Sequence, residues 1–342
     1  MRIMRMDRGK LIILITVISA FFAACKPEFS VNDVKQDITI AYCLLNVNET
    51  EHYVKIYKAF LTDDNAYKFA SNSGLEAISY MDSIEVVMEE NIGGKIVRQI
   101  PFDTTTTIPK DSGLFPHPTQ ILYAAKNITL LPNATYRLKL KNKYTEKECY
   151  AETKLVNNFF ISQPIGELNL TFFNPVNCGF TLSENAVSYE MYQIFRYVEV
   201  DKNTGERTKH SVKRKVSNAE VNTTGATVIK YNINNIYKII GDQVKKNDKV
   251  TRYIDTYACI DYEAWLAGKA YSLYVKATNQ TSSVLNNKIE YTNFVSDDNS
   301  AFGVFSSRNS AKRTYTISSM SEDSLVAGQY TKHLGFHKST EQ

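Results

Sequence analysis

The chain has 342 residues, of which 43% are hydrophobic and 22% charged, and its formal net charge is +4 at pH 7. A balance this close to neutral argues against a dedicated nucleic-acid-binding protein, whose affinity depends on neutralising phosphates. The length suffices for two domains of ordinary size. The 22 Tyr and 17 Phe, beside only 14 Gly and 8 Pro, favour β-structure.

Residues 1–24 have the pattern of an export signal. Basic residues precede an almost entirely apolar run, 11–22, and the small residues Ala23 and Ala24 follow it. The run is too short for a membrane-spanning helix, which needs roughly 20 residues. It has the length of a signal-peptide core. We therefore expect 1–24 to be removed, with a retained membrane anchor as the alternative.

The residues Phe22-Ala23-Ala24-Cys25 resemble a bacterial lipobox, although Leu is the usual residue at the first position. In lipoproteins the thiol of the invariant Cys is acylated, and cleavage makes that Cys the new N-terminus. Several acyl chains give stable membrane anchoring, whereas one gives only marginal binding. The resemblance implies lipidation at Cys25, followed by a linker over 25–36. Ordinary secretion with an unmodified Cys25 is the alternative.

Four cysteines remain after Cys25: Cys43, Cys149, Cys178 and Cys259. Four cysteines in an exported protein allow three disulfide connectivities, and Cys43–Cys149 with Cys178–Cys259 is the natural pairing. Each also lies in a strand-like apolar run, where buried free cysteine is common, so the disulfide state is left open. No Cys/His spacing is typical of zinc, and neither a metal nor a cofactor is predicted.

The first half reads as successive strands that make up a β-sandwich domain over 37–156. Apolar alternation predicts strands at 37–47, 51–61, 83–91 and 95–103. The last two are joined through Gly93-Gly94, which is typical of a hairpin. The segments between these strand pairs, and residues 104–120, read as loops.

The stretch LLPNATYRLKLKNKY contains the most specific structural pattern of the first half. Leu130 and Pro132 lie six and four residues before Tyr136, a spacing that resembles the tyrosine corner of immunoglobulin-like and fibronectin type III sandwiches. In that motif the Tyr hydroxyl bonds back to the backbone of the corner. An ordinary junction between a loop and a strand is the alternative.

The second half predicts another sandwich domain over 157–310, with strands at 167–174, 189–200 and 207–216. A further strand is expected at 271–277, where Tyr271, Leu273, Val275 and Ala277 alternate with more polar residues. Residues 234–247 predict one short helix, because their isoleucines recur on one helical face. Residues 311–342 lose this pattern and predict a partly ordered tail. The predicted fold class is all-β, with two immunoglobulin/fibronectin III-like sandwiches in tandem.

No nucleophile elbow, phosphate-binding loop or dinucleotide fingerprint occurs. Paired carboxylates for glycoside hydrolysis depend on separation in space and are not identifiable locally. Trp265 with Tyr262 is the candidate platform for a glycan, and the alternative for both residues is core packing.

A resemblance extends over most of the chain after the signal. The chain is similar to the DUF4249-type outer-membrane lipoproteins of the Bacteroidetes in its lipobox and in the segments LLN, HYVKIYKAFL, DDNA, DSGLFPHPTQILY, ATYRL and FGVFSSR. The resemblance implies a lipid-anchored outer-membrane protein with immunoglobulin-like domains, and no functional residues carry over. Only Glu28 lies close to Cys25, so the sequence leaves open whether the protein faces the periplasm or the cell surface.

The same resemblance implies O-glycosylation where Asp is followed by Ser or Thr and then by an apolar residue or Thr, a pattern that Ser83, Thr104 and Ser324 fit. Chance occurrence of so short a pattern is the alternative.

These observations predict a non-catalytic, lipid-anchored protein whose sandwich surfaces bind a protein or glycan partner in the cell envelope. Nucleic acid is not an expected partner. Three alternatives remain: an accessory subunit of a nutrient-uptake or surface-assembly complex, a hydrolase with a dispersed active site, and a purely structural spacer of the envelope.

Overall fold

A computed structural model describes residues 38–59, 79–110, 119–170, 176–221, 226–231, 235–254, 259–280 and 291–338. All of them belong to one compact unit, Asp37–Gln342. The predicted signal peptide, the linker 25–36 and Cys25 lie outside the described residues. The described part is mostly β, in several sheets that pack as sandwiches, which confirms the predicted fold class.

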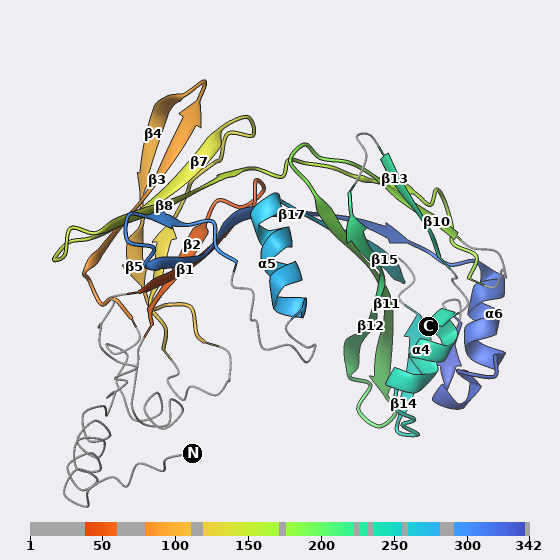
Figure 1. Ribbon diagram of the computed structural model, residues 1–342. Helices are drawn as coiled ribbons and strands as arrows, with labels where there is room; N and C mark the ends of the chain where they lie inside the picture. The colour runs from red at the N-terminus through yellow and green to blue at the C-terminus, as the bar shows by residue number, and fades with distance from the viewer. Residues whose placement is uncertain are drawn as a thin grey trace, which may run out of the picture. The chain divides into compact units, whose positions relative to one another are not determined.

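The largest sheet has ten strands (Figure 1). Nine run in the order β18-β14-β11-β15-β17-β1-β2-β6-β5, and β12 pairs with β11. Their bounds are β1 (Thr39–Leu45), β2 (His52–Lys58), β5 (Asp103–Thr105), β6 (Leu122–Ala125), β11 (Ser188–Asp201), β12 (Arg207–Glu220), β14 (Val250–Ile254), β15 (Ile260–Ala267), β17 (Ala301–Tyr315) and β18 (Phe336–His337).

A five-stranded sheet packs against one end of the large sheet. Its strands, in spatial order, are β16 (Val295–Ser296), β8 (Glu148–Lys154), β7 (Thr135–Asn142), β3 (Ile84–Ile92) and β4 (Lys95–Pro101). Burial alternates strictly along β7, because side chains of a strand point to opposite faces. The first core lies between the sheets and includes Ile56, Met88, Tyr136, Leu138 and Phe305.

The turn between β3 and β4 is the predicted hairpin. Gly93 and Gly94 have φ angles of 58° and 80°. Two successive positive φ angles define the turn type that matches the twist of a hairpin, and glycine adopts them without a steric penalty.

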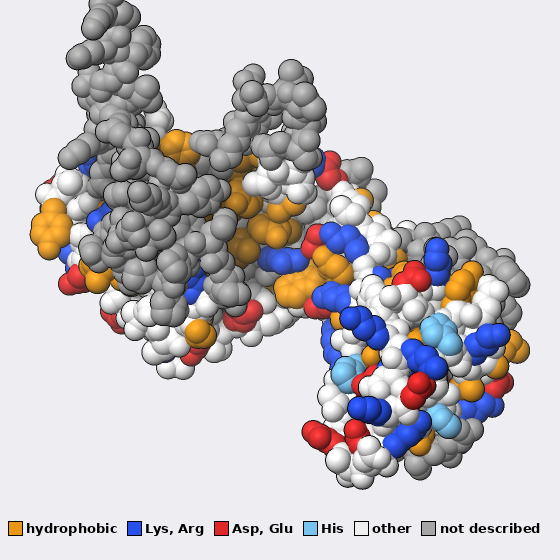
Figure 2. Space-filling view, turned by 90° about the horizontal axis from the view of Figure 1, so that it is seen from below, with side chains coloured by type: hydrophobic (Ala, Val, Ile, Leu, Met, Phe, Trp, Pro, Cys, Tyr) orange, Lys and Arg blue, Asp and Glu red, His pale blue; other side chains and the backbone are white. Residues whose placement is uncertain are grey.

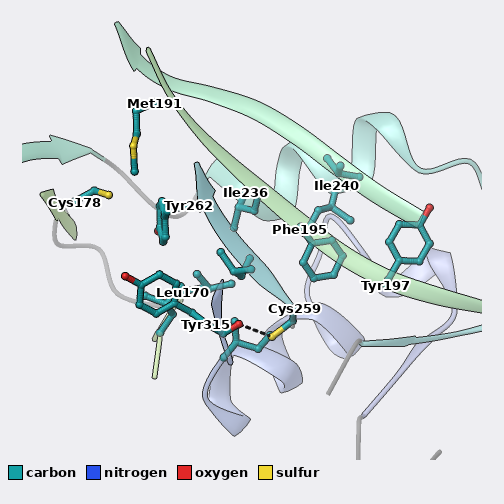
Figure 3. Packing of buried hydrophobic residues seen from close by; sticks show 14 of the residues in the cluster. Leu170, Cys178, Met191, Phe195, Tyr197, Ile236, Ile240, Cys259, Tyr262 and Tyr315 are labelled. Carbon is teal, nitrogen blue, oxygen red and sulfur yellow. Dashed lines mark hydrogen bonds between the residues drawn. The ribbon is translucent and has the colours of Figure 1, made fainter. Parts of the chain in front are cut away.

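The second core lies against the same face of the large sheet, farther along it. A three-stranded sheet covers part of this core, in the order β13 (Ala226–Tyr231), β10 (Val176–Thr181) and β9 (Ile161–Gln163). The helices α4 (Asn235–Gln243) and α6 (Ser319–Ala327) contribute Ile236, Ile240 and Leu325 to it. Figure 3 shows Phe195, Tyr262 and Tyr315 directed into this packing. The helix predicted over 234–247 is therefore confirmed as α4.

Strand β17 belongs to both cores. Its first half pairs in parallel with β1, from Thr39↔Ala301 to Leu45↔Ser307, and its second half pairs antiparallel with β15. Alternate residues of β17 enter the first core (Phe305) and then the second (Tyr315). The chain from the first sandwich to the second crosses β17 at its midpoint, where Val156 N–H donates to Ser307 Oγ (2.9 Å).

The predicted boundary at 156 needs correction for this reason. The sandwich expected within 37–156 takes β16 and the first half of β17 from the C-terminal part of the chain. Each of its two sheets thus contains a strand that lies far away in the sequence.

Two predictions about the C-terminal third are wrong. The strand expected at 271–277 is part of a helix, α5 (Lys269–Gln280), so the described residues contain three α-helices rather than one. The tail expected to be partly ordered continues β17 and then forms α6, the short 3₁₀ helix η1 (Lys332–Leu334) and β18. Leu334 and Phe336 are buried, and the buried Arg252 guanidinium donates to the Leu334 carbonyl. Packing of these few apolar residues orders the segment despite its weak pattern.

The tyrosine corner has the predicted contact. Leu131 N–H donates to the Tyr136 hydroxyl at 2.6 Å, and that hydroxyl donates to the buried carboxylate of Glu90. Arg98 binds the same carboxylate through two hydrogen bonds of 2.9 and 3.1 Å. Cys43, Cys149, Cys178 and Cys259, whose disulfide state the sequence left open, are all buried, and none of the four forms a disulfide.

Candidate ligand-binding site

The second face of the ten-stranded sheet carries helix α5. On β17 the residues that alternate with the core positions point to this face, and α5 packs over them (Figure 1). The helix approaches through small residues, because Ala270, Ser272 and Ala277 are its buried side chains. Tyr271 N–H donates to the buried Ser306 Oγ of β17 (3.1 Å), which holds the first turn of the helix on the strand.

A pocket of about 190 Å³ lies between α5 and the neighbouring strands. Figure 2 shows the molecule from below, with hydrophobic side chains gathered near the middle of this face and acidic and basic side chains beside them. The pocket combines three aromatic residues, Tyr189, Trp265 and Tyr271, with a guanidinium, carboxylates and amides, and its polar lining includes Arg308, Glu190, Asn218 and Asn279. This mixture is typical of a site that recognises a polar ligand with apolar faces.

Arg308 is the central cation of the pocket. Its guanidinium carbon lies 4.2 Å from the centroid of the Trp265 ring and 5.5 Å from that of Tyr271. An arginine over an aromatic face is held by cation–π attraction. One edge of the guanidinium donates to Glu190 Oε2 at 3.0 Å, and the side chain is 25% exposed. Trp265, Tyr271 and Glu190 together therefore fix the position of the Arg308 guanidinium.

Glu190 anchors this arrangement. Its Oε1 accepts from Lys215 Nζ at 2.7 Å, and its Oε2 accepts from the Tyr192 hydroxyl at 3.1 Å as well as from Arg308. Burial opposes ionisation of the carboxyl, but the hydrogen bonds and charges of Lys215, Tyr192 and Arg308 outweigh it and lower the pKa of Glu190. Glu190 is consequently an ionised structural partner of the two cations.

The two predicted platform residues have different roles, and Tyr262 does not contribute to a surface. Tyr262 is 0% exposed, and its hydroxyl accepts from the Gln193 side chain at 3.0 Å inside the second core (Figure 3). Burial raises its pKa above the ordinary value. Side chains alternate along a strand, so Tyr262 and Trp265, three residues apart, point to opposite faces of β15. Trp265 is half-buried and lies in the pocket wall.

The residues that the sequence did not identify are Arg308, Glu190 and Tyr271. Tyr271 was expected in a strand, and Arg308 and Glu190 are separated from it and from each other by long stretches of chain. The pairing of β11 with β15 and of β15 with β17 brings Glu190 and Arg308 to Trp265, and α5 contributes Tyr271 to the same pocket lining. In the sequence itself, only the arginine that ends the apolar run FGVFSSR, which is Arg308, pointed to this site.

The three predicted O-glycosylation sites lie in different surroundings. Thr104 is exposed in the short edge strand β5, whereas Ser83 is half-buried directly before β3. Ser324 lies within α6, where its hydroxyl donates to the Met320 carbonyl at 3.0 Å. Thr104 is the one of the three whose side chain is exposed on an edge strand.

Within the described ranges, no group of three or more His, Cys, Asp or Glu side chains is placed to hold a metal ion. None of the helices in these ranges has the length and apolarity needed to cross a membrane.

No protein-family model and no curated protein matches the sequence. Among the solved structures that match, two show weak similarity to it. The C-terminal globular domain of an oligosaccharyltransferase from Pyrococcus abyssi has 10% identity and a TM-score of 0.21, over 82% of this chain and 49% of that one. CBD12 from CALX1.2 has 8% identity and a TM-score of 0.18, over 82% of this chain and 100% of that one. The chain thus spans about half the length of the first, and similarities this weak say nothing about its function.

Proposed function

We propose that the protein is a lipid-anchored, non-catalytic binding protein of the outer membrane, which holds a glycan in the pocket between α5 and the large sheet. The lipid anchor is a proposal from the lipobox-like residues that end at Cys25. The glycan is a proposal from the pocket. The resemblance to DUF4249-type lipoproteins of the Bacteroidetes supports the same location.

The observation that carries the proposal is the pairing of Trp265 and Tyr271 with fixed polar groups in one small pocket. Aromatic rings offer an apolar surface for the C–H faces of a sugar, while amides and charged groups bind its hydroxyls. The pocket is smaller than the clefts of roughly 300–1,000 Å³ that hold drug-sized ligands. Its volume of about 190 Å³ suits a single sugar ring, such as one residue of a longer chain.

The non-catalytic part of the proposal is supported by the state of the carboxylates. A hydrolytic site needs a carboxylic acid whose pKa is raised, so that it can protonate the leaving group. The pKa of Glu190 is lowered, and Glu220, the other carboxylate of the lining, forms an ion pair with Lys276. A hydrolase with a dispersed site would predict turnover of a bound oligosaccharide.

The test is a glycan-binding screen of the mature protein in detergent, with each bound oligosaccharide also analysed for cleavage. We expect binding without cleavage, and Trp265→Ala should weaken it about tenfold or more, because a buried aromatic anchor commonly contributes 2 kcal/mol or more. Tyr144→Ala is the matched control, since Tyr144 is 82% exposed and does not line the pocket. Equal binding by wild type and Trp265→Ala would overturn the proposed site, and cleavage would favour the hydrolase.

A further inference from the structure

We infer that the sugar bound at this pocket carries a carboxylate, so that the ligand class is an acidic saccharide whose carboxylate is held by the guanidinium of Arg308. This inference rests on the proposed glycan-binding function and adds the chemical class of the ligand.

Arg308 has more hydrogen-bond donors than the described residues accept. A guanidinium has five N–H donors in a planar fork. Glu190 takes one of them, at 3.0 Å, and no other acceptor for Arg308 is found among the described residues. The group is nevertheless three-quarters buried and lies in the wall of the pocket. A fixed and partly dehydrated guanidinium with spare donors matches the two oxygens of a carboxylate.

Both carboxylates that line the pocket are already paired with cations. Glu190 is bound by Lys215 and Arg308, and Glu220 is bound by Lys276. In these two ion-pair clusters three cations accompany two carboxylates, and of the three only Arg308 and Lys276 line the pocket itself. Glu190 already has a lysine of its own, so a ligand carboxylate would neutralise Arg308 without displacing an existing ion pair.

The surroundings of Arg308 favour a saccharide over an acidic peptide as the ligand. The guanidinium lies against the Trp265 and Tyr271 rings, so a group bound to its free edge is placed beside aromatic surface. Side-chain amides of Asn218 and Asn279 lie in the same lining and match hydroxyl groups of a sugar. A small pocket with one guanidinium whose donors are not all used suits a compact ring with one carboxylate better than an extended chain of carboxylates.

The experiment compares short oligogalacturonides with their methyl esters, which have the same sugar chain without the charge. A second pair, hyaluronan oligosaccharides and their carboxyl-reduced forms, tests another uronic acid. Binding to the full mature protein is measured by titration calorimetry in buffer with chelator. We expect at least one acidic form to bind about tenfold tighter than its neutral counterpart, the effect of one charge-assisted bidentate pair.

Three variants locate the effect. Arg308→Gln should abolish the preference for the acid, and Arg308→Lys, which keeps the charge but loses the fork, should recover only part of it. Arg207→Gln is the matched control, because it removes the same charge from the exposed end of β12. It should keep the preference. Thermal melts of all variants establish that loss of binding does not reflect unfolding.

The outcomes separate the two proposals. Equal binding of acidic and neutral forms that is lost in Trp265→Ala would overturn the acidic ligand and leave the glycan site intact. No binding of any oligosaccharide would overturn both. Competition by oligoglutamate as strong as by the saccharide would overturn the saccharide class, and an equal loss in Arg207→Gln would reduce the effect to general electrostatic attraction.

Discussion

At the scale of single residues, the positions that the sequence identified correctly are those whose role depends on near neighbours. The bond of Tyr136 to Leu131 spans five residues, and the glycine pair 93–94 forms a turn within one hairpin. The residues that were misjudged depend on partners far away. Tyr262 and Trp265 have similar aromatic character, and only the strand pairing of β15 decides that one lies in the core and the other in a pocket wall.

Gly303 of β17 pairs with Ala41 of β1, so it lies where the C-terminal part of the chain meets the first strand. Its φ is +118°, and a Cβ at this position would lie 1.8 Å from the Ala41 carbonyl oxygen of β1. We expect Gly303→Ala to lower the free energy of unfolding by about 3 kcal/mol or more, since the clash is with backbone that cannot move away cheaply. Chemical denaturation measures the loss.

Gly205→Ala is the matched control for this substitution. Gly205 also has a positive φ, of +71°, but nothing lies within 4 Å of the added methyl group. A cost of about 1–2 kcal/mol is expected there from backbone conformation alone. Equal losses in the two variants would show that the contact of β17 with β1 is not close.

His52 predicts a pH dependence of stability. The side chain is buried, neither ring nitrogen has a hydrogen-bond partner among the described residues, and desolvation lowers its pKa, although the nearby Ile128 backbone and the charge of Glu49 oppose the shift. The unfolded chain therefore binds a proton that the folded chain does not, once the pH falls below about 6.5. The contribution of neutral, buried His52 to the free energy of unfolding is therefore complete above that pH. It is lost as the pH decreases towards the lowered pKa of His52 in the folded protein.

Denaturation curves between pH 7.5 and about 5 measure this term. His52→Phe removes the titrating group and should reduce the slope of stability against pH by at most about 1.4 kcal/mol per unit. His333→Phe is the control, because His333 is exposed in η1. An unchanged slope in His52→Phe would contradict the assignment.

At the scale of elements, most strands could be predicted because each has one buried and one solvated face, which gives the alternation its period of two. Helix α5 could not. Its large residues alternate like those of a strand, while its buried side chains are the small residues Ala270, Ser272 and Ala277. Small residues hardly register in a hydrophobic pattern, so the helical period was hidden. The pocket depends on this helix, and its position was therefore missed as well.

The C-terminal elements give the prediction at this scale. Phe336 of β18 is 3% exposed, and its ring centroid lies 6.0 Å from that of Phe195 and 5.4 Å from that of Tyr197. Phe336→Ala should destabilise the protein by about 3–5 kcal/mol, as expected for a large aromatic residue lost from a core. Lys332→Ala, at an exposed position of η1, should change stability by no more than about 0.5 kcal/mol. If both substitutions changed the stability by similarly small amounts, the C-terminal segment would be only partly ordered, as the sequence predicted.

At the scale of the whole molecule, β17 pairs with the first sandwich and then with the second. Sequence patterns could predict each sandwich but not this exchange, because Thr39 and Ala301 are paired across nearly the entire chain. Pairing at such separation leaves no trace in local periodicity. The two cores share a strand, so we expect them to be coupled in stability.

The proposed anchor is also a property of the whole molecule. Cys25→Ser removes the thiol that would be acylated, and we expect the variant to remain unlabelled by palmitate analogues and to leave the membrane fraction. Several acyl chains stabilise membrane binding by about 0.8 kcal/mol for each buried CH₂, so their loss should be decisive. Cys43→Ser is the control, since Cys43 is buried in the first core. Unchanged membrane fractionation of Cys25→Ser would contradict lipidation.

The central claim is that a glycan binds beside Trp265, which is the only tryptophan in the sequence. Intrinsic tryptophan fluorescence therefore reports on the pocket wall alone. Titration with an oligosaccharide that binds in the screen should change the emission saturably, with the midpoint found by calorimetry, and Arg308→Gln should shift that midpoint for an acidic ligand. Calorimetric binding that leaves the emission of Trp265 unchanged would place the ligand elsewhere and contradict the account.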